Sequence, residues 1–346
     1  TLGAIGAAIT IGAVFWIYGR DLPSHESLSQ YKPPTISRIY SVEGRIIDEF
    51  ARERRLFTPV DEVPVSIKNA FISAEDKNFY SHPGYDVRGI ISAIVDAVRS
   101  GGQVVRGAST ITQQVMKNFL LDGSRQAERK IKEIILATRI ENTLPKSKIL
   151  ELYLNEIFLG QNSYGVTAAA QTYFNKTLDQ LAPHEAAFLA ALPKAPSKFH
   201  PVRKKDRLLE RRNYVLREMW QNGYLNETEY KVELQKPLKS VQNGDFPSFK
   251  SSLPARDYFT DEIRRQLSRN FGEEEFFTSG MTVRATLDPE MQSVAATALQ
   301  RALEAFDRKQ GAWRGTGLKL TEPQLGYWRE ALSELHMSRK INLEGR

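Results

Sequence analysis

A long run of helical patterning constrains the fold of this chain more than any other feature. From Val65 to about Asn222, apolar residues recur every three or four positions, as they do along the buried face of an amphipathic helix. Strand patterns do not alternate with helices in this region, which argues against a parallel α/β sheet. The sequence therefore predicts a mainly α fold built around one helical domain.

Local signals divide this region into separate helices. Ile67 and Phe71 share one helix face, and their spacing brings Glu75 to the helix end. A second helix follows Asp86, whose side chain can cap it. Further helices are expected at 110–120, 125–144, 146–158, 166–174, 183–192 and 204–222.

Shorter β patterns flank the helical region. Two apolar pieces surround a turn at Glu43-Gly44, which predicts a hairpin between residues 36 and 57. After residue 237 we expect a helix at 258–271, a strand at 281–286, and a helix capped by Asp288 with Pro289 in its first turn. These elements indicate a partial α+β linker module at the C-terminus.

An uncharged segment opens the chain. Leu2–Tyr18 makes a helix of roughly 25 Å, slightly less than a hydrocarbon core of about 30 Å. Phe15 and Trp16 stand where an interfacial aromatic belt forms, and Arg20 ends the segment. We therefore expect an N-terminal transmembrane helix over residues 1–19. The alternative, a signal-peptide core, lacks a small-residue cleavage site directly after it.

The composition narrows the choice of partners. The formal net charge is +7, which favours phosphates or anionic lipid headgroups, although a need for solubility explains the same excess. The chain has no cysteine, which excludes disulfides, thiol catalysis and Cys-ligated zinc.

The first motif with chemical content joins Glu75 and Asp76 to a loop that contains His82, Pro83 and Gly84. A carboxylate at a helix end, half in a protein wall and half in a cleft, can take a proton from a sugar hydroxyl. The motif therefore predicts a general base.

A second motif, Gly107–Gln114, begins the next helix. Ser109 or Thr110 can cap that helix, and the free N–H groups at its start suit a phosphate. An ordinary capped helix with polar exposed residues is the alternative.

A third motif concentrates charge within one helix. Arg129 and Lys130 each stand about one turn before Glu133, so two cations and a carboxylate share a helix face. Lys117 and Arg125 can extend this positive surface. The alternative is a surface ion pair with little effect on stability.

Two further motifs are predicted to be structural. Within residues 146–155, Ile149, Tyr153 and Leu154 occupy packing positions. Within residues 164–196, Pro183 and His184 are expected to start a helix rather than to hold a metal.

The five motifs, in this order, resemble the glycosyltransferase domain of class A penicillin-binding proteins and of the monofunctional peptidoglycan glycosyltransferases, glycosyltransferase family 51. The similarity runs from about Ile36 to Trp220. Asn175 departs from the family pattern, in which a glycine is common at this place. Ser29–Lys32 matches only the first of three transpeptidase motifs, so the resemblance does not include a transpeptidase domain.

The resemblance implies a lysozyme-like helical glycosyltransferase domain over residues 59–236, with a small membrane-associated lobe. Residues 20–58 would form a juxtamembrane linker and hairpin, and residues 237–346 a linker and the start of the region that precedes a transpeptidase domain. The implied location is the bacterial cytoplasmic (inner) membrane, crossed once, with the catalytic domain on the periplasmic or extracellular side.

The implied reaction is inverting polymerisation of lipid II into β-1,4-linked glycan strands, with release of undecaprenyl pyrophosphate. Implied partners are lipid II, the growing glycan strand, membrane lipids, other cell wall synthesis proteins and the inhibitor moenomycin, but no nucleic acid. The resemblance requires no cofactor. A divalent cation, Mg²⁺ or Mn²⁺, at the pyrophosphate near Glu133 stays an open alternative.

Residue roles follow from the matching motifs. Glu75 matches the family's base and Glu133 its second site carboxylate, so the resemblance implies that both are catalytic. It implies substrate-binding roles for the other polar residues of these motifs: Asp76, Ser109, Thr110, Gln113, Gln114, Lys117, Arg125, Arg129 and Lys130.

Two other functions stay open from the sequence. A lysozyme-like muramidase or lytic transglycosylase would share the helical fold and a catalytic glutamate, but it would need no cationic face for a pyrophosphate. A catalytically inactive, membrane-anchored scaffold would need neither feature.

Overall fold

The computed structural model describes residues 17–20, 22, 28, 31, 36–51, 53–99, 109–121, 126–249, 258–311, 322–327 and 330. The chain divides into two compact units. The first comprises Thr1–Arg38 and Asp48–Val283, and the second comprises Ile39–Ile47 and Arg284–Arg346. All five sequence motifs belong to the first unit.

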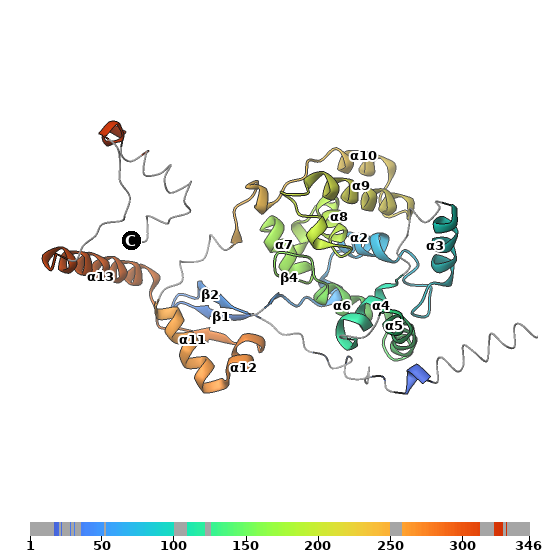
Figure 1. The fold of residues 1–346 in the computed structure, drawn as a ribbon, viewed down its shortest axis with the longest axis horizontal. Coiled ribbons are helices and arrows are strands. Elements are labelled where there is room, and N and C mark those ends of the chain that lie inside the picture. The colour runs from blue at the N-terminus through green and yellow to red at the C-terminus, as the bar shows by residue number, and fades with distance from the viewer. Residues whose placement is uncertain are drawn as a thin grey trace, which may run out of the picture. The chain divides into compact units, whose positions relative to one another are not determined.

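The first unit is mainly helical, which confirms the mainly α part of the predicted fold (Figure 1). Its helices are α2 (Val65–Glu75), α3 (Val87–Arg99), α4 (Ile111–Leu120), α5 (Gln126–Glu141), α6 (Lys146–Glu156), α7 (Val166–Phe174), α8 (Pro183–Ala191), α9 (Lys205–Gln221), α10 (Glu227–Leu234), α11 (Tyr258–Phe271) and α12 (Glu273–Thr278).

Helix ends follow the local signals in the sequence. At the start of α8, the Glu185 carboxylate accepts a hydrogen bond from the backbone N–H of Ala182 at 3.0 Å. At the end of α7, Asn175 has the left-handed conformation, with φ 52°. Asparagine tolerates this conformation better than most residues, so the departure from glycine at this position causes no break in the fold.

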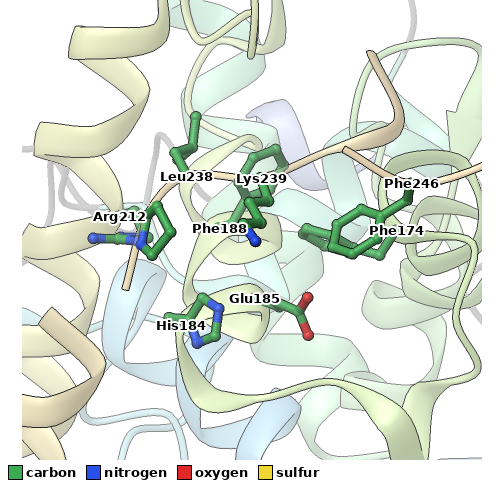
Figure 2. A pocket seen from close by; sticks show the side chains of 9 residues that line it. Phe174, His184, Glu185, Phe188, Arg212, Leu238, Lys239 and Phe246 are labelled. Atoms are coloured by element: carbon green, nitrogen blue, oxygen red, sulfur yellow. The ribbon is translucent and has the colours of Figure 1, made fainter. Parts of the chain in front are cut away.

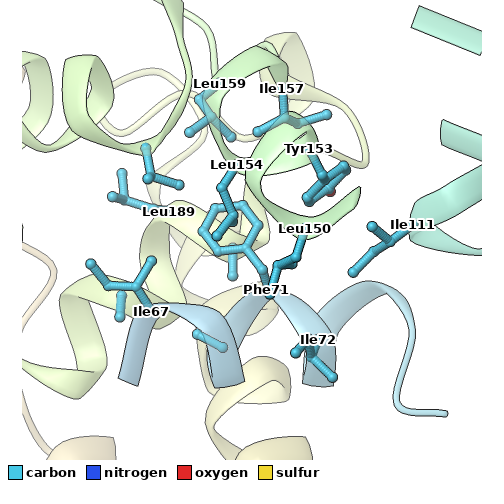
Figure 3. Close-up of a cluster of buried hydrophobic side chains, with 14 of the residues drawn as sticks. Ile67, Phe71, Ile72, Ile111, Leu150, Tyr153, Leu154, Ile157, Leu159 and Leu189 are labelled. Carbon is cyan, nitrogen blue, oxygen red and sulfur yellow. The ribbon is translucent and has the colours of Figure 1, made fainter. Parts of the chain in front are cut away.

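A buried apolar core holds α2, α4 and α6 together (Figure 3). Phe71 of α2 meets Tyr153 of α6 edge to face, with ring centroids 6.1 Å apart. Ile111, the first residue of α4, is fully buried in the same cluster. Each large apolar side chain buried in this way contributes about 1.5–3 kcal/mol. The core thereby fixes the position of the α2 end that carries Glu75.

Short strands complete the structure. A three-stranded sheet has the order β2-β1-β5, from β2 (Ile46–Phe50), β1 (Ser37–Tyr40) and β5 (Thr282–Arg284). β3 (Arg54–Arg55) pairs in parallel with β4 (Ser163–Tyr164). The predicted hairpin is confirmed, because Ser41 N–H donates to Arg45 carbonyl at 2.8 Å and Gly44 has φ 84°.

In the second unit, α13 (Pro289–Lys309) begins as predicted. The Asp288 side chain accepts hydrogen bonds from the backbone N–H groups of Glu290 and Met291, at 2.9 and 3.1 Å. Pro289 occupies the first helical position, where its missing N–H costs nothing.

One side chain links the segment before α2 to the end of α6. Asn155 accepts from Thr58 N–H at 2.8 Å and donates to Thr58 carbonyl at 2.9 Å. The turn at Gly165 then packs against the Asn155 backbone, where an added Cβ would lie only 2.5 Å from the Asn155 carbonyl oxygen. This close approach requires glycine.

Within the described residues, which begin at Ile17, no helix combines the length and apolar character needed to cross a bilayer. The predicted transmembrane helix at residues 1–19 lies almost wholly outside the described residues and stays a prediction.

Gly165→Ala should destabilise the protein by about 3 kcal/mol, because it combines a positive φ with a backbone clash. Gly223→Ala is the matched control: Gly223 has φ 77° but no atom within 4 Å of an added Cβ, so about 1 kcal/mol is expected. Chemical unfolding of both variants measures the difference. Equal losses would contradict the role of the Asn155 contact.

Candidate active site

Glu75 is the last residue of α2, and both oxygens of its carboxylate face polar neighbours. Oε2 accepts a hydrogen bond from Gln114 Nε2 at 2.9 Å. Oε1 lies 3.7 Å from Nη2 of Arg211, which is on α9. The Glu75 side chain is 13% exposed, so the carboxylate is set in the protein wall with a small part open to solvent.

Burial raises the pKa of Glu75 above its ordinary value. The hydrogen bond from Gln114 and the positive charges of Arg211 and Lys194 lower this pKa but do not cancel the effect of burial, while the adjacent Asp76 raises it further. A carboxylate with a raised pKa is a stronger base once it is ionised. These properties suit a group that removes a proton from a hydroxyl.

Asp76 ties the loop after α2 to the start of α4. Its Oδ2 accepts hydrogen bonds from His82 Nε2 and from the backbone N–H of Ile111, both at 2.9 Å. Gly84 N–H donates to His82 Nδ1 at 3.1 Å, which leaves Nε2 as the ring nitrogen that donates to Asp76. Because Asp76 is buried and engaged inside the protein, we propose that it positions the site rather than contacts substrate.

Thr110 fixes the start of α4. It is the capping residue, and its hydroxyl oxygen accepts from the backbone N–H of Gln113 at 3.1 Å. The same hydroxyl donates to the carbonyl of Gly84 at 2.7 Å. The sequence left the cap open between Ser109 and Thr110, and the structure assigns it to Thr110.

Lys130 of α5 connects several of the predicted residues. Its Nζ donates to Ser109 Oγ at 2.7 Å, to Gln113 Oε1 at 2.9 Å and to Glu133 Oε2 at 3.0 Å. The Lys130 side chain is 42% exposed, so an anion from solvent can reach it. The arrangement places a cation beside the N-terminus of α4.

Glu133 lies between two cations. Lys130 Nζ lies 3.0 Å from Oε2 of Glu133, and Arg129 Nε lies 3.4 Å from Oε1. The predicted pairing along one helix face is therefore confirmed. With a side chain only 7% exposed, Glu133 balances the charge of the two cations and keeps them in place.

Among the described residues, no contact links the last two predicted cations to this group. Lys117 is in the last turn of α4 and is exposed, away from the capped end of the helix. Arg125 lies outside the described residues.

The surroundings of Glu133 do not resemble a metal site built by the protein. Both of its oxygens face cations, whereas Mg²⁺ and Mn²⁺ take several oxygen ligands. Across the part of the chain that the structure describes, no group of three histidine, cysteine, aspartate or glutamate side chains could hold a metal ion.

The sequence patterns missed two cations near Glu75. Arg211 belongs to α9, and Lys194 lies in the turn after α8. One signal was present, because Arg211 and Arg212 interrupt the apolar stripe between the buried residues Leu208 and Val215. A cation on the apolar face of a helix is rarely exposed and needs a partner in the interior.

The sequence patterns also missed a network behind the first motif. Lys146 Nζ donates to the carbonyl of His82 at 2.8 Å and to Glu141 Oε1 at 2.7 Å. Thr112 Oγ1 donates to the same Glu141 oxygen at 2.6 Å. Lys146 also sits over the ring of Phe79 at 4.5 Å. The network therefore joins α4, α5 and α6 to the loop that follows Glu75.

A pocket elsewhere in the first unit holds none of the predicted site residues (Figure 2). It lies among Phe174, Phe188 and Phe246, with charged side chains at its edge. Two of these side chains have partners within the protein: His184 Nδ1 lies 2.6 Å from Glu233, and Glu185 pairs with Lys176 at 2.7 Å. The pocket is therefore not the candidate active site.

Comparison with known proteins gives the geometry a family context. A family model described as Transglycosylase matches residues 43–220, just over half of the chain. The chain belongs to the transglycosylase family. Glu75, Lys130, Glu133 and Arg211 all lie within the matched residues.

Similar proteins share one description. Penicillin-binding protein 1A of Rickettsia felis is 41% identical over 96% of this chain and 41% of that protein. Penicillin-binding protein 1A of Neisseria flavescens is 43% identical over 89% of this chain and 38% of that protein. The crystal structure of Penicillin-Binding Protein 1A from Haemophilus influenzae has 29% identity and a TM-score of 0.47, covering 86% of this chain and 35% of that one.

The chain spans about two fifths of the length of the curated relatives it matches. The five motifs fall inside the shared part, whereas more than half of each relative has no counterpart in this chain.

Glu75→Gln should raise stability at neutral pH. The folded-state pKa is raised, so the unfolded chain releases the Glu75 proton first as pH increases. The wild type therefore loses stability between its unfolded and folded pKa values, and the Gln variant does not. Below this window the ionisation of Glu75 should contribute no difference in unfolding free energy between the two proteins. Above it, the difference should stay constant.

Unfolding free energies measured from acidic to neutral pH test this expectation. Glu62→Gln, at an exposed residue of the same unit, controls for loss of a carboxylate. A gap that opens with the wild type as the more stable protein would show that the Glu75 pKa is lowered in the folded state.

Proposed function

We propose that this chain is a peptidoglycan glycosyltransferase that polymerises lipid II into β-1,4-linked glycan strands, in bacterial cell wall synthesis. One observation carries the proposal: adjacent residues of α4 hold the two reactive groups. Gln113 accepts a hydrogen bond from Lys130, and Gln114 donates one to Glu75. A base and an anion-binding cation are thus fixed relative to each other by one helix.

This pair suits transfer of a sugar from a pyrophosphate. Glu75 takes the proton of the acceptor's 4-hydroxyl while the hydroxyl oxygen attacks the anomeric carbon of the donor. The bond from that carbon to the pyrophosphate breaks, and undecaprenyl pyrophosphate leaves with the electron pair. Direct attack inverts the α-linked donor to a β linkage.

Cations handle the leaving group. Lys130 and Arg129 can stabilise negative charge on the pyrophosphate, and the N-terminus of α4 adds the partial positive charge of its dipole. Pyrophosphate leaves readily, so no carboxylic acid is needed to protonate it. A glycosidase differs here, because its alkoxide leaving group needs a protonated acid.

The roles of the remaining residues follow. Glu133 keeps the two cations in place, Ser109 and Gln113 hold Lys130, and Gln114 holds Glu75, while Thr110 caps the helix that carries both glutamines. Substrate-binding roles for these four residues are part of the proposal. Substrate-binding roles for Lys117 and Arg125 stay predictions. Lys117 is exposed in the last turn of α4, and Arg125 lies outside the described residues.

No observation favours either alternative over the glycosyltransferase. The reaction of a muramidase or lytic transglycosylase would not require Lys130 and Arg129 beside the start of α4. An inactive scaffold would not require Glu75, Lys130 and Glu133, each with a hydrogen-bond or ion-pair partner.

A membrane location follows from the proposed lipid substrate. We propose a lysozyme-like domain over residues 59–236, and a single-pass anchor in the cytoplasmic membrane at residues 1–19. The exposed face of α3 supports membrane contact, because Val87, Ile91 and Val95 are 52%, 56% and 39% exposed at four-residue spacing. Membrane lipids, other cell wall synthesis proteins and moenomycin are the proposed partners.

Glu75→Gln should reduce polymerisation of labelled lipid II by about 10²–10⁴-fold, because it removes the general base without changing the shape of the side chain. Glu62→Gln should keep full activity. Gel separation of the glycan products measures both. Substantial polymerisation by Glu75→Gln would remove Glu75 as the base, and release of reducing sugar from finished glycan would favour a muramidase.

Lys130→Ala should slow lipid II polymerisation by about 10²-fold or more and should weaken moenomycin binding, because both ligands place phosphate groups beside the cation. Lys132→Ala is the matched control. Lys132 is on the same helix but pairs with Glu128 at 2.7 Å, away from α4. Equal turnover and inhibitor affinity in the two variants would show that Lys130 does not contact phosphate.

A further inference from the structure

Arg211 has an unusual position for a residue outside the five motifs. It reaches the carboxylate of Glu75 from α9, whereas the hydrogen bond from Gln114 comes from α4. The two contacts fall on different oxygens: Arg211 Nη2 is 3.7 Å from Oε1, and Gln114 Nε2 is 2.9 Å from Oε2. The carboxylate is therefore held between two helices.

The Arg211 side chain is fixed in place rather than free at the surface. Its Nη2 donates to the carbonyl of Ala74 at 3.3 Å, one residue before Glu75. Its guanidinium stacks on the ring of Tyr214, with Cζ 4.6 Å from the ring centroid. Only 14% of the side chain is exposed. An arginine ordered at this level has little conformational freedom left to lose in an ion pair.

The distance between the charges has chemical consequences. A separation of 3.7 Å is longer than the 2.7–2.9 Å or so of a charge-assisted hydrogen bond. Arg211 therefore stabilises the ionised carboxylate through charge, but it does not cap the oxygen that must receive a proton. A closer contact would stabilise the carboxylate more and weaken it as a base.

Several other groups face Glu75 and act on the same carboxylate. Asp76, the next residue along the chain, disfavours its ionised form, whereas Gln114 of α4 and Lys194 of the turn after α8 favour it. The buried hydroxyl of Tyr153, on α6, also feels the Glu75 charge. Burial raises the pKa of Glu75 more than any of these groups changes it, so the charge of Arg211 works against the largest effect in the site.

We propose that Arg211 is a positioning residue for Glu75: it orients the carboxylate and keeps it ionised, so that Glu75 can act as a base near neutral pH. The catalytic part of this inference rests on the proposed glycosyltransferase function. The electrostatic part, a cation that stabilises a buried carboxylate, does not depend on it.

The chain supplies a closely matched control. Arg217 stacks on the same ring of Tyr214, with its Cζ 5.1 Å from the centroid, but it is 49% exposed and pairs with Glu218 instead. Arg211→Gln and Arg217→Gln therefore remove the same kind of stacking contact. Only the first removes the charge beside Glu75.

The first experiment measures lipid II polymerisation by both variants across pH. With Arg211→Gln, the acidic limb of the kcat/KM profile should move to higher pH, with a several-fold loss of rate at the acidic end and recovery toward the plateau. Arg217→Gln should match the wild type, and Arg211→Lys should restore part of the shift. A loss that appears only in the acceptor KM, with no shift in the profile, would make Arg211 a substrate contact and overturn the proposal.

The second experiment does not need the enzyme to be active. Titration of ¹³C-labelled glutamate side chains by NMR, with Glu75→Gln to assign the Glu75 signal, reports the pKa directly. That pKa should rise in Arg211→Gln and stay unchanged in Arg217→Gln. An unchanged pKa in Arg211→Gln would overturn the proposal, even in a fully active enzyme.

The two readouts separate failure of the inference from failure of the proposed function. A wild type that cannot polymerise lipid II would contradict the function, and the NMR titration would still decide the role of Arg211. If Arg211→Gln unfolds, as circular dichroism would show, Arg211→Lys provides the same comparison. Lysine keeps the charge but lacks the planar stacking group, so a smaller shift in the same direction is expected.

Discussion

The anchored N-terminus of α4 is the constraint on which the candidate site depends. Asp76 accepts the N–H of Ile111, and the Thr110 hydroxyl donates to the carbonyl of Gly84. Both bonds join α4 to the loop that follows α2. Once this end is fixed, Gln113 and Gln114 are fixed with it. Neighbouring residues of a helix point about 100° apart, so one helix can serve a cation on one side and a base on the other.

The two glutamates of the site receive different environments, and these separate their roles. Glu133 forms ion pairs with Lys130 and Arg129, so its negative charge balances theirs and holds them in place. Glu75 has a hydrogen bond from Gln114 and the nearby charges of Arg211 and Lys194, while burial raises its pKa. Two carboxylates in unlike surroundings can act as a charge partner and as a base in the same site.

Features that depend on one or two helical turns were predictable from the sequence. These include the end of α2 at Glu75, a helix cap at Ser109 or Thr110, and the pairing of Arg129 and Lys130 with Glu133. Each is decided by residues that are close in the chain, and spacing alone indicates them. The division of labour between Glu75 and Asp76 was less accessible, because it depends on which of them reaches the start of α4.

Contacts between distant segments were not predictable in this way. Arg211 meets Glu75 only because α9 packs against α2, and Lys146 reaches the carbonyl of His82 only because α6 packs behind the same loop. No local pattern encodes such pairs. The interruption of the apolar face of α9 by arginine signals a buried partner, but it does not identify Glu75 as that partner.

The contacts of Lys130 bear on how an anion would bind. Its ammonium has three N–H donors, and Ser109, Gln113 and Glu133 already occupy three positions around it. A phosphate must therefore replace one of these partners or bind by charge alone. Replacing Ser109 or Gln113 loses a neutral hydrogen bond, whereas replacing Glu133 loses an ion pair. Gln113 is buried, so its freed oxygen would stay unpaired, and the serine is therefore the contact that costs least to give up. Phosphate would then enter on the side of Lys130 nearest the start of α4. There the helix dipole adds to the attraction, and Gln113 keeps the cation in register with Gln114 and, through it, with Glu75.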